Sequence, residues 1–332
     1  MQKTRLGIVG LGSMGKIHLH NSMKMPSCQV TAVADKSTSA LKYAREMGVK
    51  KGYKDYNKLF EKEDLDAVII SLPNFLHLDS TIKAAENDIN VLLEKPIARN
   101  SEEGEKILSK VRSSGIKLMM GYPLRFSPDI QNVSNRIIDG SLGDIIVAIG
   151  TNISGGPFTG RSADGRPVPV PDWWFDKDLI GGGVLLDIGI HHLNLFNHFF
   201  GEVKEIDCDL GYRYNMEFED QAILFLKYVC GTNAIVNVGW FSEDFKTNLE
   251  LYGTVGNIIM PSEDPSPFVK VFRGIKNKIG FANEKKNSFY NEVDYFSYCI
   301  GADENPVPSG EEGLNDINII QKAYDKASLT IK

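Results

Sequence analysis

The stretch GIVGLGSMGKIH, residues 7–18, decides how the first third of the chain folds, and two phosphate-binding patterns overlap in it. Gly10 to Lys16 nearly spells G-x-x-x-x-G-K, the phosphate loop of ATP and GTP enzymes. Gly10, Gly12 and Gly15 also spell G-x-G-x-x-G, the turn that holds the pyrophosphate of a dinucleotide. Both loops present backbone N–H groups to phosphate at the start of a helix, but they imply different chemistry.

The residues around the loop decide between the two patterns. A triphosphate loop needs Ser or Thr directly after the lysine to hold Mg²⁺, and this chain has Ile17 there. A dinucleotide loop needs a strand before the glycines and an acid at the end of the next strand. The segment LGIV supplies the strand, and Asp35 supplies the acid. We therefore predict a dinucleotide loop whose cofactor contacts are Gly10, Gly12, Ser13, Met14 and Gly15.

Asp35 also bears on which cofactor is bound. Its carboxylate is expected to accept hydrogen bonds from the adenosine ribose hydroxyls and to repel a 2′-phosphate, which favours NAD. Lys36 follows directly and could pair with that phosphate, so NADP stays open. Methyltransferases also combine a glycine-rich first turn with an acid after the second strand, and the loop alone does not exclude them.

The first 122 residues alternate aliphatic segments with segments of helical period. Strands that are apolar on both faces and alternate with helices predict a parallel sheet covered on two sides, hence an α/β domain. We expect strands at 5–10, 29–35, 66–73, 89–96 and 116–123, and helices at 13–25, 37–47, 75–88 and 101–114, the last with Ser101 as its N-cap.

The pattern changes after residue 122. Between 203 and 260, strand-like segments follow one another with only short turns between them, which predicts an antiparallel sheet. Helical segments follow at 287–301 and 311–330. We therefore predict two domains, a dinucleotide-binding domain at 1–122 and an α+β domain at 123–332.

Composition and charge exclude several classes of protein. A net charge of −6 gives no basic surface for nucleic acid or acidic lipid. No apolar segment is expected to span a membrane, and the N-terminus does not resemble an export signal. The four cysteines are isolated and no Cys/His cluster suggests a metal, so we expect a cytoplasmic protein with reduced thiols and no metal site.

Two further segments carry candidate catalytic residues. LLEKP places Lys95 at the carboxyl end of a parallel strand, the edge where ligands bind, although a solvated lysine is an equally good interpretation of the spacing. GGGVLLDIGIHHL places Asp187 and His191 four residues apart, on one face of a helix. An aspartate that orients a histidine is suited to general base catalysis, but a surface pair or a core histidine fits the same spacing.

Taken together, these motifs resemble the glucose–fructose oxidoreductase, inositol dehydrogenase and rhizopine-catabolism (Gfo/Idh/MocA) family of NAD(P)-dependent oxidoreductases. The resemblance covers nearly the whole chain and rests on GLGSMG, VAD, SLPNFLH, LLEKP, GYPLRFSP and GGGVLLDIGIHHL. It implies an N-terminal Rossmann domain and a second domain with a mainly antiparallel open sheet, whose outer face pairs with another subunit in a homodimer or homotetramer.

The resemblance also implies roles for individual residues. Lys95, Asp187 and His191 are expected to be catalytic and to contact the substrate, with Tyr122 and Trp174 beside it. The Lys95–Pro96 peptide is expected to be cis. Besides the glycine loop, the expected cofactor contacts are Asp35, Lys36, Leu72, Pro73, Asn74, His77, Glu94, Lys95 and Arg125.

The chain departs from the family pattern at Pro123, where asparagine is common, and at Asn194, where aspartate is common. His192, beside the motif histidine, is unusual and could face the pocket or pack in the core. Arg161 and Arg166 could bind a phosphate or carboxylate of a substrate, although loop arginines are usually solvated.

The function that follows is hydride transfer between NAD(P) and a secondary alcohol or ketone of a sugar, cyclitol or sugar derivative, including nucleotide-sugars. The alternative is a non-catalytic sensor of cofactor or sugar on the same fold. A sensor of that kind is expected to lack the lysine or the histidine, and this chain has both.

Overall fold

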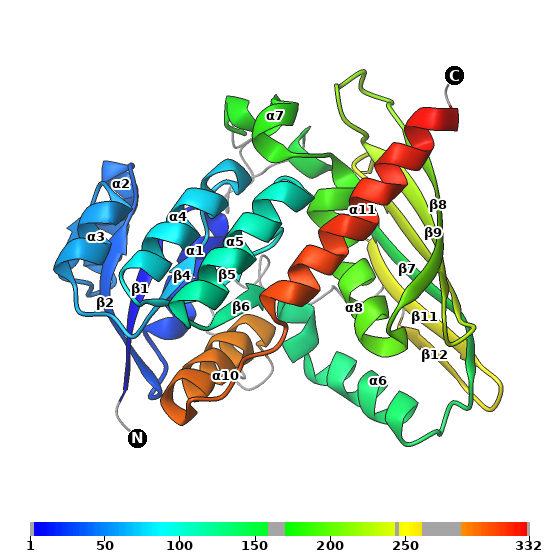
Figure 1. Cartoon of the computed structure of the whole chain (residues 1–332), viewed down its shortest axis with the longest axis horizontal. Helices are drawn as coiled ribbons and strands as arrows, with labels where there is room; N and C mark the ends of the chain where they lie inside the picture. The colour runs from blue at the N-terminus through cyan, green and yellow to red at the C-terminus, as the bar shows by residue number, and fades with distance from the viewer. Residues whose placement is uncertain (1–2, 159–169, 243–245, 261–286, 331–332) are drawn as a thin grey trace. The chain divides into compact units, whose positions relative to one another are not determined.

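The computed structural model describes residues 3–158, 170–242, 246–260 and 287–330 (Figure 1). The chain divides into two compact units. Unit 1 comprises Met1–Phe126 and Lys285–Asn315, and unit 2 comprises Ser127–Glu284 and Asp316–Lys332. Each unit contains one six-stranded sheet, so the predicted α/β class with a second sheet domain is confirmed.

The sheet of unit 1 is parallel throughout and runs in the order β3-β2-β1-β4-β5-β6. This is the strand order of dinucleotide-binding folds, in which β1 and β4 are neighbours at the point where the order reverses. The strands are β1 (Thr4–Val9), β2 (Cys28–Ala34), β3 (Lys51–Tyr53), β4 (Ala67–Ile70), β5 (Asn90–Glu94) and β6 (Leu118–Gly121).

The helices of unit 1 follow the predicted alternation, with additions. They are α1 (Ser13–Ser22), α2 (Thr38–Glu46), α3 (Tyr56–Lys62), η1 (Asn74–Leu76), α4 (His77–Glu86), α5 (Ser101–Ser114), η2 (Pro123–Phe126), α10 (Ser288–Ala302) and the first residues of α11 (Gly310–Thr330). The sequence did not reveal β3 and α3, which are only three and seven residues long. The N-cap of α5 is Asn100 rather than Ser101, because the Asn100 side chain accepts the Glu103 N–H at 3.0 Å.

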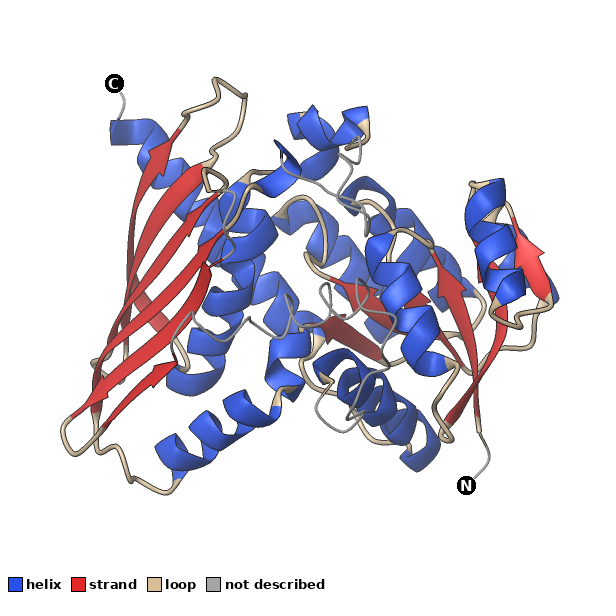
Figure 2. Ribbon diagram, turned by 180° about the vertical axis from the view of Figure 1, so that it is seen from behind, coloured by secondary structure: helices blue, strands red, loops and turns tan. Residues whose placement is uncertain are grey.

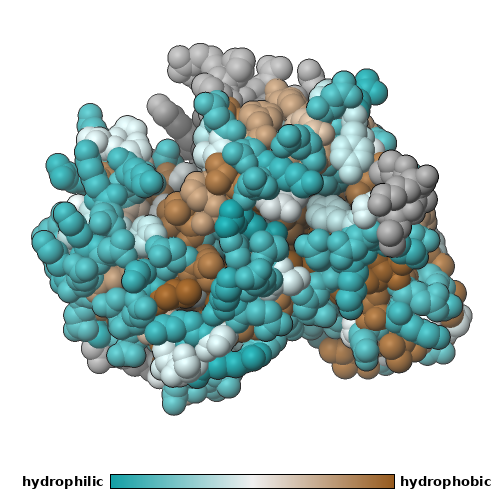
Figure 3. All heavy atoms as spheres, turned by 45° about the horizontal axis from the view of Figure 1, so that its top comes forward, coloured by the Kyte–Doolittle hydropathy of each residue, from teal (hydrophilic) through white to brown (hydrophobic). Residues whose placement is uncertain are grey.

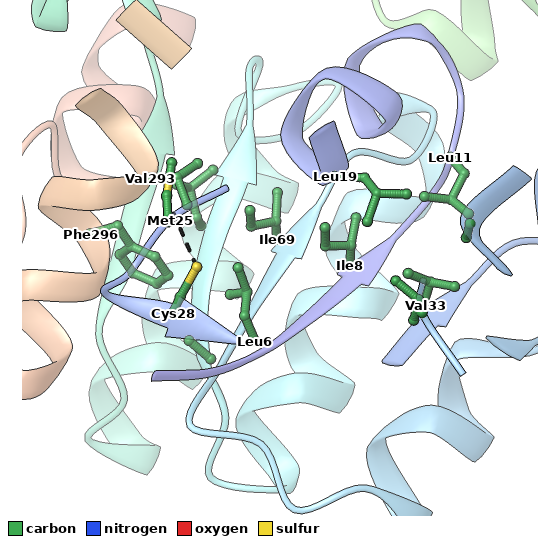
Figure 4. Packing of buried hydrophobic residues seen from close by; sticks show 14 of the residues in the cluster. Leu6, Ile8, Leu11, Leu19, Met25, Cys28, Val33, Ile69, Val293 and Phe296 are labelled. Atoms are coloured by element: carbon green, nitrogen blue, oxygen red, sulfur yellow. Dashed lines mark hydrogen bonds between the residues drawn. The ribbon is translucent and has the colours of Figure 1, made fainter. Parts of the chain in front are cut away.

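Helix α10 belongs to unit 1, although the predicted boundary assigned all of 123–332 to the second domain. Its buried Val293 and Phe296 join the same hydrophobic cluster as Leu6, Met25 and Cys28 (Figure 4). All five side chains are at most 4% exposed. The prediction failed here because a helix of hydrophobic period does not indicate which sheet it will cover.

The sheet of unit 2 runs in the order β12-β11-β7-β10-β9-β8 (Figure 2). All neighbouring pairs are antiparallel except β7 and β10, so the predicted mainly antiparallel sheet is confirmed. The sequence did not reveal the interior strand β7. The strands are β7 (Ile145–Ile153), β8 (Val203–Gly211), β9 (Gln221–Tyr228), β10 (Asn233–Gly239), β11 (Lys246–Gly253) and β12 (Asn257–Met260).

The helices of unit 2 are α6 (Pro128–Ile138), η3 (Gly156–Phe158), η4 (Asp172–Phe175), α7 (Lys177–Ile180), the π-helical turn η5 (Leu185–Gly189), α8 (Ile190–Phe200) and most of α11. Helices α8 and α11 lie against one face of this unit's sheet (Figure 1).

The two faces of this sheet differ in burial. Along β9, exposed and buried residues alternate strictly, so one face is packed and the other is open. The open face carries apolar side chains toward both edges of the sheet: Ile223 and Phe225 of β9 and Ile259 of β12 are between 36% and 58% exposed. Brown side chains gather at the right of Figure 3, on the side of unit 2 where Figure 1 draws the sheet.

One described segment, Lys177–Phe200, is long and apolar enough to cross a membrane, contrary to the expectation that none would be. Of its most apolar window, 78% is buried inside the structure. Gly181 is left-handed at the end of α7 and interrupts the segment. These features are those of a core element of a globular unit.

Candidate active site and cofactor-binding edge

The glycine loop is built from close backbone contacts in unit 1. Gly10 has a φ of +85°, and a Cβ there would lie 2.4 Å from the Ser71 carbonyl oxygen. A Cβ on Gly15 would lie 1.8 Å from the Gly10 carbonyl oxygen. At Gly12, by contrast, a Cβ would meet nothing within 4 Å. The outer two glycines therefore allow tight packing, and the middle one leaves open space.

This open space fits a dinucleotide pyrophosphate. Helix α1 begins after Gly12 and has no side-chain cap, so its first N–H groups are available to an anion. Ser13 is exposed and Met14 is half-buried at the same turn. Ile17 is 4% exposed, which also removes it as a metal-binding position of a triphosphate loop.

Asp35 ties the glycine loop to the end of β2. Its Oδ2 accepts the Leu11 N–H at 2.6 Å, and its Oδ1 accepts the Ser37 N–H at 2.7 Å. Each carboxylate oxygen has a further lone pair, so Asp35 retains the capacity to accept ribose hydroxyls. Lys36, directly after it, is exposed.

His77 joins the loops that follow β4 and β5. Its ring is fully buried, with Nδ1 2.8 Å from the Pro96 carbonyl oxygen and Nε2 2.8 Å from the Leu72 carbonyl oxygen. Burial lowers the pKa of His77, while the two carbonyls oppose that shift because only an imidazolium donates from both nitrogens. Leu72, Pro73 and Asn74 are half-buried. His77 therefore connects the loops after β4 and β5, and both of its ring nitrogens are used in doing so.

Glu94, which is expected to line the cofactor, also contacts helix α1. Its side chain is buried, and its Oε1 lies 2.7 Å from His18 Nε2 on α1. Glu292 of α10 is 0% exposed, so its carboxyl group is fully removed from water. Burial, and then the charge of Glu94, raise the pKa of Glu292 well above its ordinary value, against a lowering by the Tyr122 backbone N–H, so the neutral form of the acid is favoured.

The remaining expected residues of unit 1 have different surroundings. Lys95 is half-buried at the carboxyl end of β5, and the Lys95–Pro96 peptide is cis as expected. The Arg125 guanidinium lies 3.5 Å from the Glu312 carboxylate. The side chain of Arg125 is 9% exposed. Tyr122 is 1% exposed, which disfavours the expected contact with substrate.

The D-x-G-x-H segment lies in unit 2. Asp187 is half-buried in the π-helical turn η5, and His191 is 5% exposed in the first turn of α8. The sequence predicted an ordinary α-helix here. π-helical turns are rare and often occur at functional sites. Two residues four positions apart still fall on the same side of the helix, because a π-turn takes slightly more than four residues.

The unusual His192 packs in the core. Burial lowers its pKa to about 4, and its Nε2 donates to the Asn248 carbonyl oxygen at 3.1 Å. A Cβ on Gly150 of β7 would lie 2.4 Å from the His192 ring. Asn194, the other departure, donates to Asp316 Oδ2 at 2.8 Å. Both residues therefore connect α8 to the rest of unit 2.

Trp174, which is expected to lie beside the substrate, belongs to a short stack of aromatic rings. The rings of Trp173 and Trp174 are stacked with centroids 5.6 Å apart, and Trp174 meets the edge of Trp240 at 6.1 Å. Trp173 and Trp174 are half-buried, while Trp240 is 1% exposed. Two of the three rings are therefore partly accessible. Arg161 and Arg166 lie outside the described residues.

Fold and cofactor edge together define an NAD(P)-binding oxidoreductase of two units. The family model described as "Oxidoreductase family, NAD-binding Rossmann fold" matches residues 4–122. The model "GFO/IDH/MocA C-terminal domain" matches residues 130–259. The chain belongs to the GFO/IDH/MocA oxidoreductase family, so the predicted family, enzyme class and nicotinamide cofactor are confirmed.

Named relatives include inositol and sugar dehydrogenases. Myo-inositol 2-dehydrogenase of Thermotoga maritima is 24% identical over 93% of this chain and 92% of its own length. The scyllo-inositol 2-dehydrogenase (NAD(+)) of Bacillus subtilis is 28% identical, over 92% of this chain and 88% of its own. The structure of levoglucosan dehydrogenase with NADH and levoglucosan superposes with a TM-score of 0.84, at 21% identity and 98% coverage of both chains, which shows a shared fold.

Proposed function

We propose that this protein oxidises a secondary alcohol of a sugar, cyclitol or sugar derivative with NAD, or reduces the matching ketone with NADH. The observation that carries the proposal is the position of Lys95 at the carboxyl end of β5. The same edge of the parallel sheet carries the open turn at Gly12 and the carboxylate of Asp35. Ligands of open α/β sheets bind at this edge, so an ammonium group there is suited to a substrate oxygen.

Each residue of the proposed site has a separate task. When bound, the nicotinamide supplies the hydride acceptor. His191, with Asp187 as its orienting carboxylate, takes the proton of the reacting hydroxyl at an imidazole nitrogen. Lys95 donates a hydrogen bond to the same oxygen and stabilises the negative charge that develops on it. The assignment of these three residues to one site rests on the family resemblance.

The remaining assignments concern cofactor and substrate surfaces. We infer that the pyrophosphate lies over Gly12, Ser13 and the N-terminus of α1, and that Asp35 accepts the ribose hydroxyls. NAD is then preferred over NADP, because a 2′-phosphate would face that carboxylate. Trp174 offers a flat apolar surface suited to one face of a sugar ring. We also propose that the enzyme acts in the cytoplasm; its four cysteines are free thiols.

A screen for turnover tests the proposal. Purified protein is mixed with sugars, cyclitols and nucleotide-sugars in the presence of NAD or NADP, and reduction of the cofactor is followed by absorbance. Lys95→Met keeps the length of the side chain but removes its charge, and it is expected to lower kcat/KM by about 1000-fold while NADH still binds. Lys83→Met, at an exposed pair with Glu86, is the matched control. Full turnover by Lys95→Met would contradict the proposed site.

We further propose that two copies of the chain associate through the open face of the unit 2 sheet. Cross-strand neighbours on that face form the row Ile259, Glu250, Ile149, Ile235 and Phe225. An apolar sheet face of this kind is typical of an interface. Light scattering of wild type and of Phe225→Glu measures the oligomeric state. We expect the variant to dissociate toward monomers, and a wild-type monomer would contradict the proposal.

A further inference from the structure

The structure assigns a positioning role to Glu219, a buried acid that no motif of the sequence marked: held by Tyr324, it caps the helix that carries Asp187 and His191. The inference rests on the proposed function, because it explains how the proposed catalytic segment is held in place. All groups of this arrangement lie in unit 2.

The helix that carries the catalytic segment begins at Val184 and continues through η5 into α8. The first N–H groups of a helix have no partner within the helix and need an acceptor elsewhere. Glu219 satisfies three successive N–H groups at this end. Its Oε2 accepts from Gly183 at 3.2 Å, its backbone oxygen from Val184 at 3.0 Å and its Oε1 from Leu185 at 3.0 Å.

The next link leads directly to Asp187, whose N–H donates to the Gly183 carbonyl oxygen at 3.0 Å. Gly183 is therefore bonded to Glu219 through its N–H and to Asp187 through its carbonyl. A rotation or shift of the Gly183 peptide would move the backbone of the proposed catalytic aspartate. A carboxylate at this place also carries the sign of charge that a helix N-terminus favours.

The third donor to the Glu219 carboxylate comes from the C-terminal helix. The Tyr324 hydroxyl of α11 donates to Glu219 Oε1 at 2.7 Å. Glu219 is 2% exposed, and burial raises its pKa while the Tyr324 hydroxyl and the N–H donors of Leu185 and Gly183 act to lower it. The Tyr324 hydroxyl and the two N–H donors therefore offset part of the cost of burying the carboxylate, although the pKa of Glu219 stays raised.

Glu219 and Tyr324 together form what we call the clamp, and two glycines of the motif pack closely against it. A Cβ on Gly183 would lie 2.0 Å from the Glu219 backbone oxygen, and one on Gly182 would lie 2.7 Å from the Tyr324 hydroxyl. Both positions therefore need a hydrogen in place of a side chain. Close packing at the start of the helix therefore explains why two of the three consecutive glycines are glycine. Phosphate binding is not needed to explain them.

Two variants and one control test the clamp. Glu219→Gln keeps the size of the side chain but turns one acceptor into a donor, which then faces an N–H or O–H group. Tyr324→Phe removes only the hydroxyl, so two N–H groups still hold the carboxylate. The control is Tyr228→Phe, which removes a buried tyrosine hydroxyl that donates to Asn197 near the other end of α8, at 2.9 Å.

The first readout needs no activity. Amide hydrogen exchange at residues 183–187 is expected to speed up in Glu219→Gln by about 10-fold or more, less in Tyr324→Phe and not at all in Tyr228→Phe. Unchanged exchange in both folded clamp variants overturns the proposal. If Glu219→Gln does not fold, Tyr324→Phe alone decides, because its carboxylate cap remains in place.

The second readout uses the enzyme with NAD and its best substrate from the screen, with kcat expressed per NADH-binding site. Glu219→Gln is expected to lower kcat about 10- to 100-fold with little change in the KM for NAD, since a small misplacement of a catalytic group has a large kinetic effect. The acid limb of kcat/KM should move to lower pH by about half a unit to one unit, because a misaligned Asp187 supports the His191 imidazolium less. A loss of kcat/KM that is equal at every pH, with no shift of the acid limb, would contradict the positioning role of Glu219. Absence of wild-type turnover defeats the proposed function but leaves the exchange result standing.

Discussion

The cofactor edge of unit 1 and the proposed catalytic segment of unit 2 both begin with glycines, yet they are held in place in different ways. At the cofactor edge, Gly15 packs on the Gly10 backbone and Gly10 packs on the Ser71 backbone. In the catalytic segment, Gly183 packs on Glu219, which lies 36 residues further along the chain. Both loops therefore pack on a distant segment, at Ser71 or at Glu219. They differ because Gly10 and Gly15 also pack on each other within one loop, which leaves a local motif of spaced glycines, whereas the partner of Gly183 leaves no motif.

The largest expected effect is on cofactor binding, at the glycine loop of unit 1. In Gly15→Ala the new Cβ would lie 1.8 Å from the Gly10 carbonyl oxygen, so the backbone of the loop must move. We expect the Kd for NADH to rise at least about 100-fold and the free energy of unfolding to fall by about 3 kcal/mol. Fluorescence titration and urea unfolding measure the two effects. Gly301→Ala, where a Cβ meets nothing within 4 Å, is the control, and unchanged NADH binding by Gly15→Ala would show that the loop is not the cofactor site.

The next largest effect is on turnover, at the proposed catalytic segment of unit 2. Gly183→Ala is expected to displace Glu219 and to lower kcat/KM about 10- to 100-fold, because the start of the catalytic helix shifts. NADH affinity should remain at the wild-type level, since the cofactor edge lies in unit 1. Steady-state kinetics and NADH titration on the same preparation separate the two quantities. Equal losses in both measurements would mean that the two regions are not independent.

A smaller effect sharpens the assignment of cofactor. Asp35→Asn keeps the size of the side chain but removes the charge and one of the two acceptors that hold the Leu11 and Ser37 N–H groups. We expect NAD to bind about 10-fold more weakly and the ratio of NADP to NAD affinity to rise. Titrations with both reduced cofactors check this. Asp55→Asn, an exposed helix cap that accepts the Asn57 N–H, serves as control; a lower NADP preference than in wild type would argue against a ribose role for Asp35.

The smallest effect concerns stability and pH. The pKa of Glu292 is raised in the folded protein, so its contribution is fully present below the unfolded pKa of about 4.5 and is lost as pH rises toward the folded pKa. Glu292→Gln mimics the neutral acid and lacks this loss. The variant should therefore gain stability over wild type with rising pH, by at most about 1.4 kcal/mol per unit. Urea midpoints measured from about pH 5 to pH 8 test this. Parallel curves for the two proteins would mean that Glu292 ionises normally.

The sequence predicted those features that depend on neighbours along the chain. The strands of unit 1, the glycine loop and Asp35 were predicted because strand, turn, helix and acid follow one another within 35 residues. The confirmed family assignment also came from such short motifs. By contrast, β7 was missed although six of its nine residues are β-branched. Its neighbours in the sheet, β10 and β11, come much later in the chain, so it does not belong to the series of strands joined by short turns on which the prediction relied.

The features that the sequence could not predict depend on contacts between distant segments. Glu94 was assigned to the cofactor because of its motif, but its partner His18 lies 76 residues away. No motif marks Glu219, Tyr324 or Glu292. Only folding brings Glu219 and Tyr324 to the start of a helix, and Glu292 close to the carboxylate of Glu94. His192 was ambiguous for the same reason, since its partner is a backbone carbonyl of β11. Burial of a charged or polar residue is set by tertiary packing, which short patterns do not encode.

The packing of α10 on unit 1 has a consequence for how the chain is made. Chains emerge from the ribosome N-terminus first, and domains generally fold as units during synthesis. The hydrophobic cluster of unit 1 includes Val293 and Phe296, which are synthesised more than 280 residues after Leu6 of the same cluster. The nucleotide-binding unit can therefore reach its final packing only after all the strands of the second sheet have been translated. A fragment that ends at residue 122 would expose the apolar side chains that α10 covers, so cofactor binding is better measured on the whole chain.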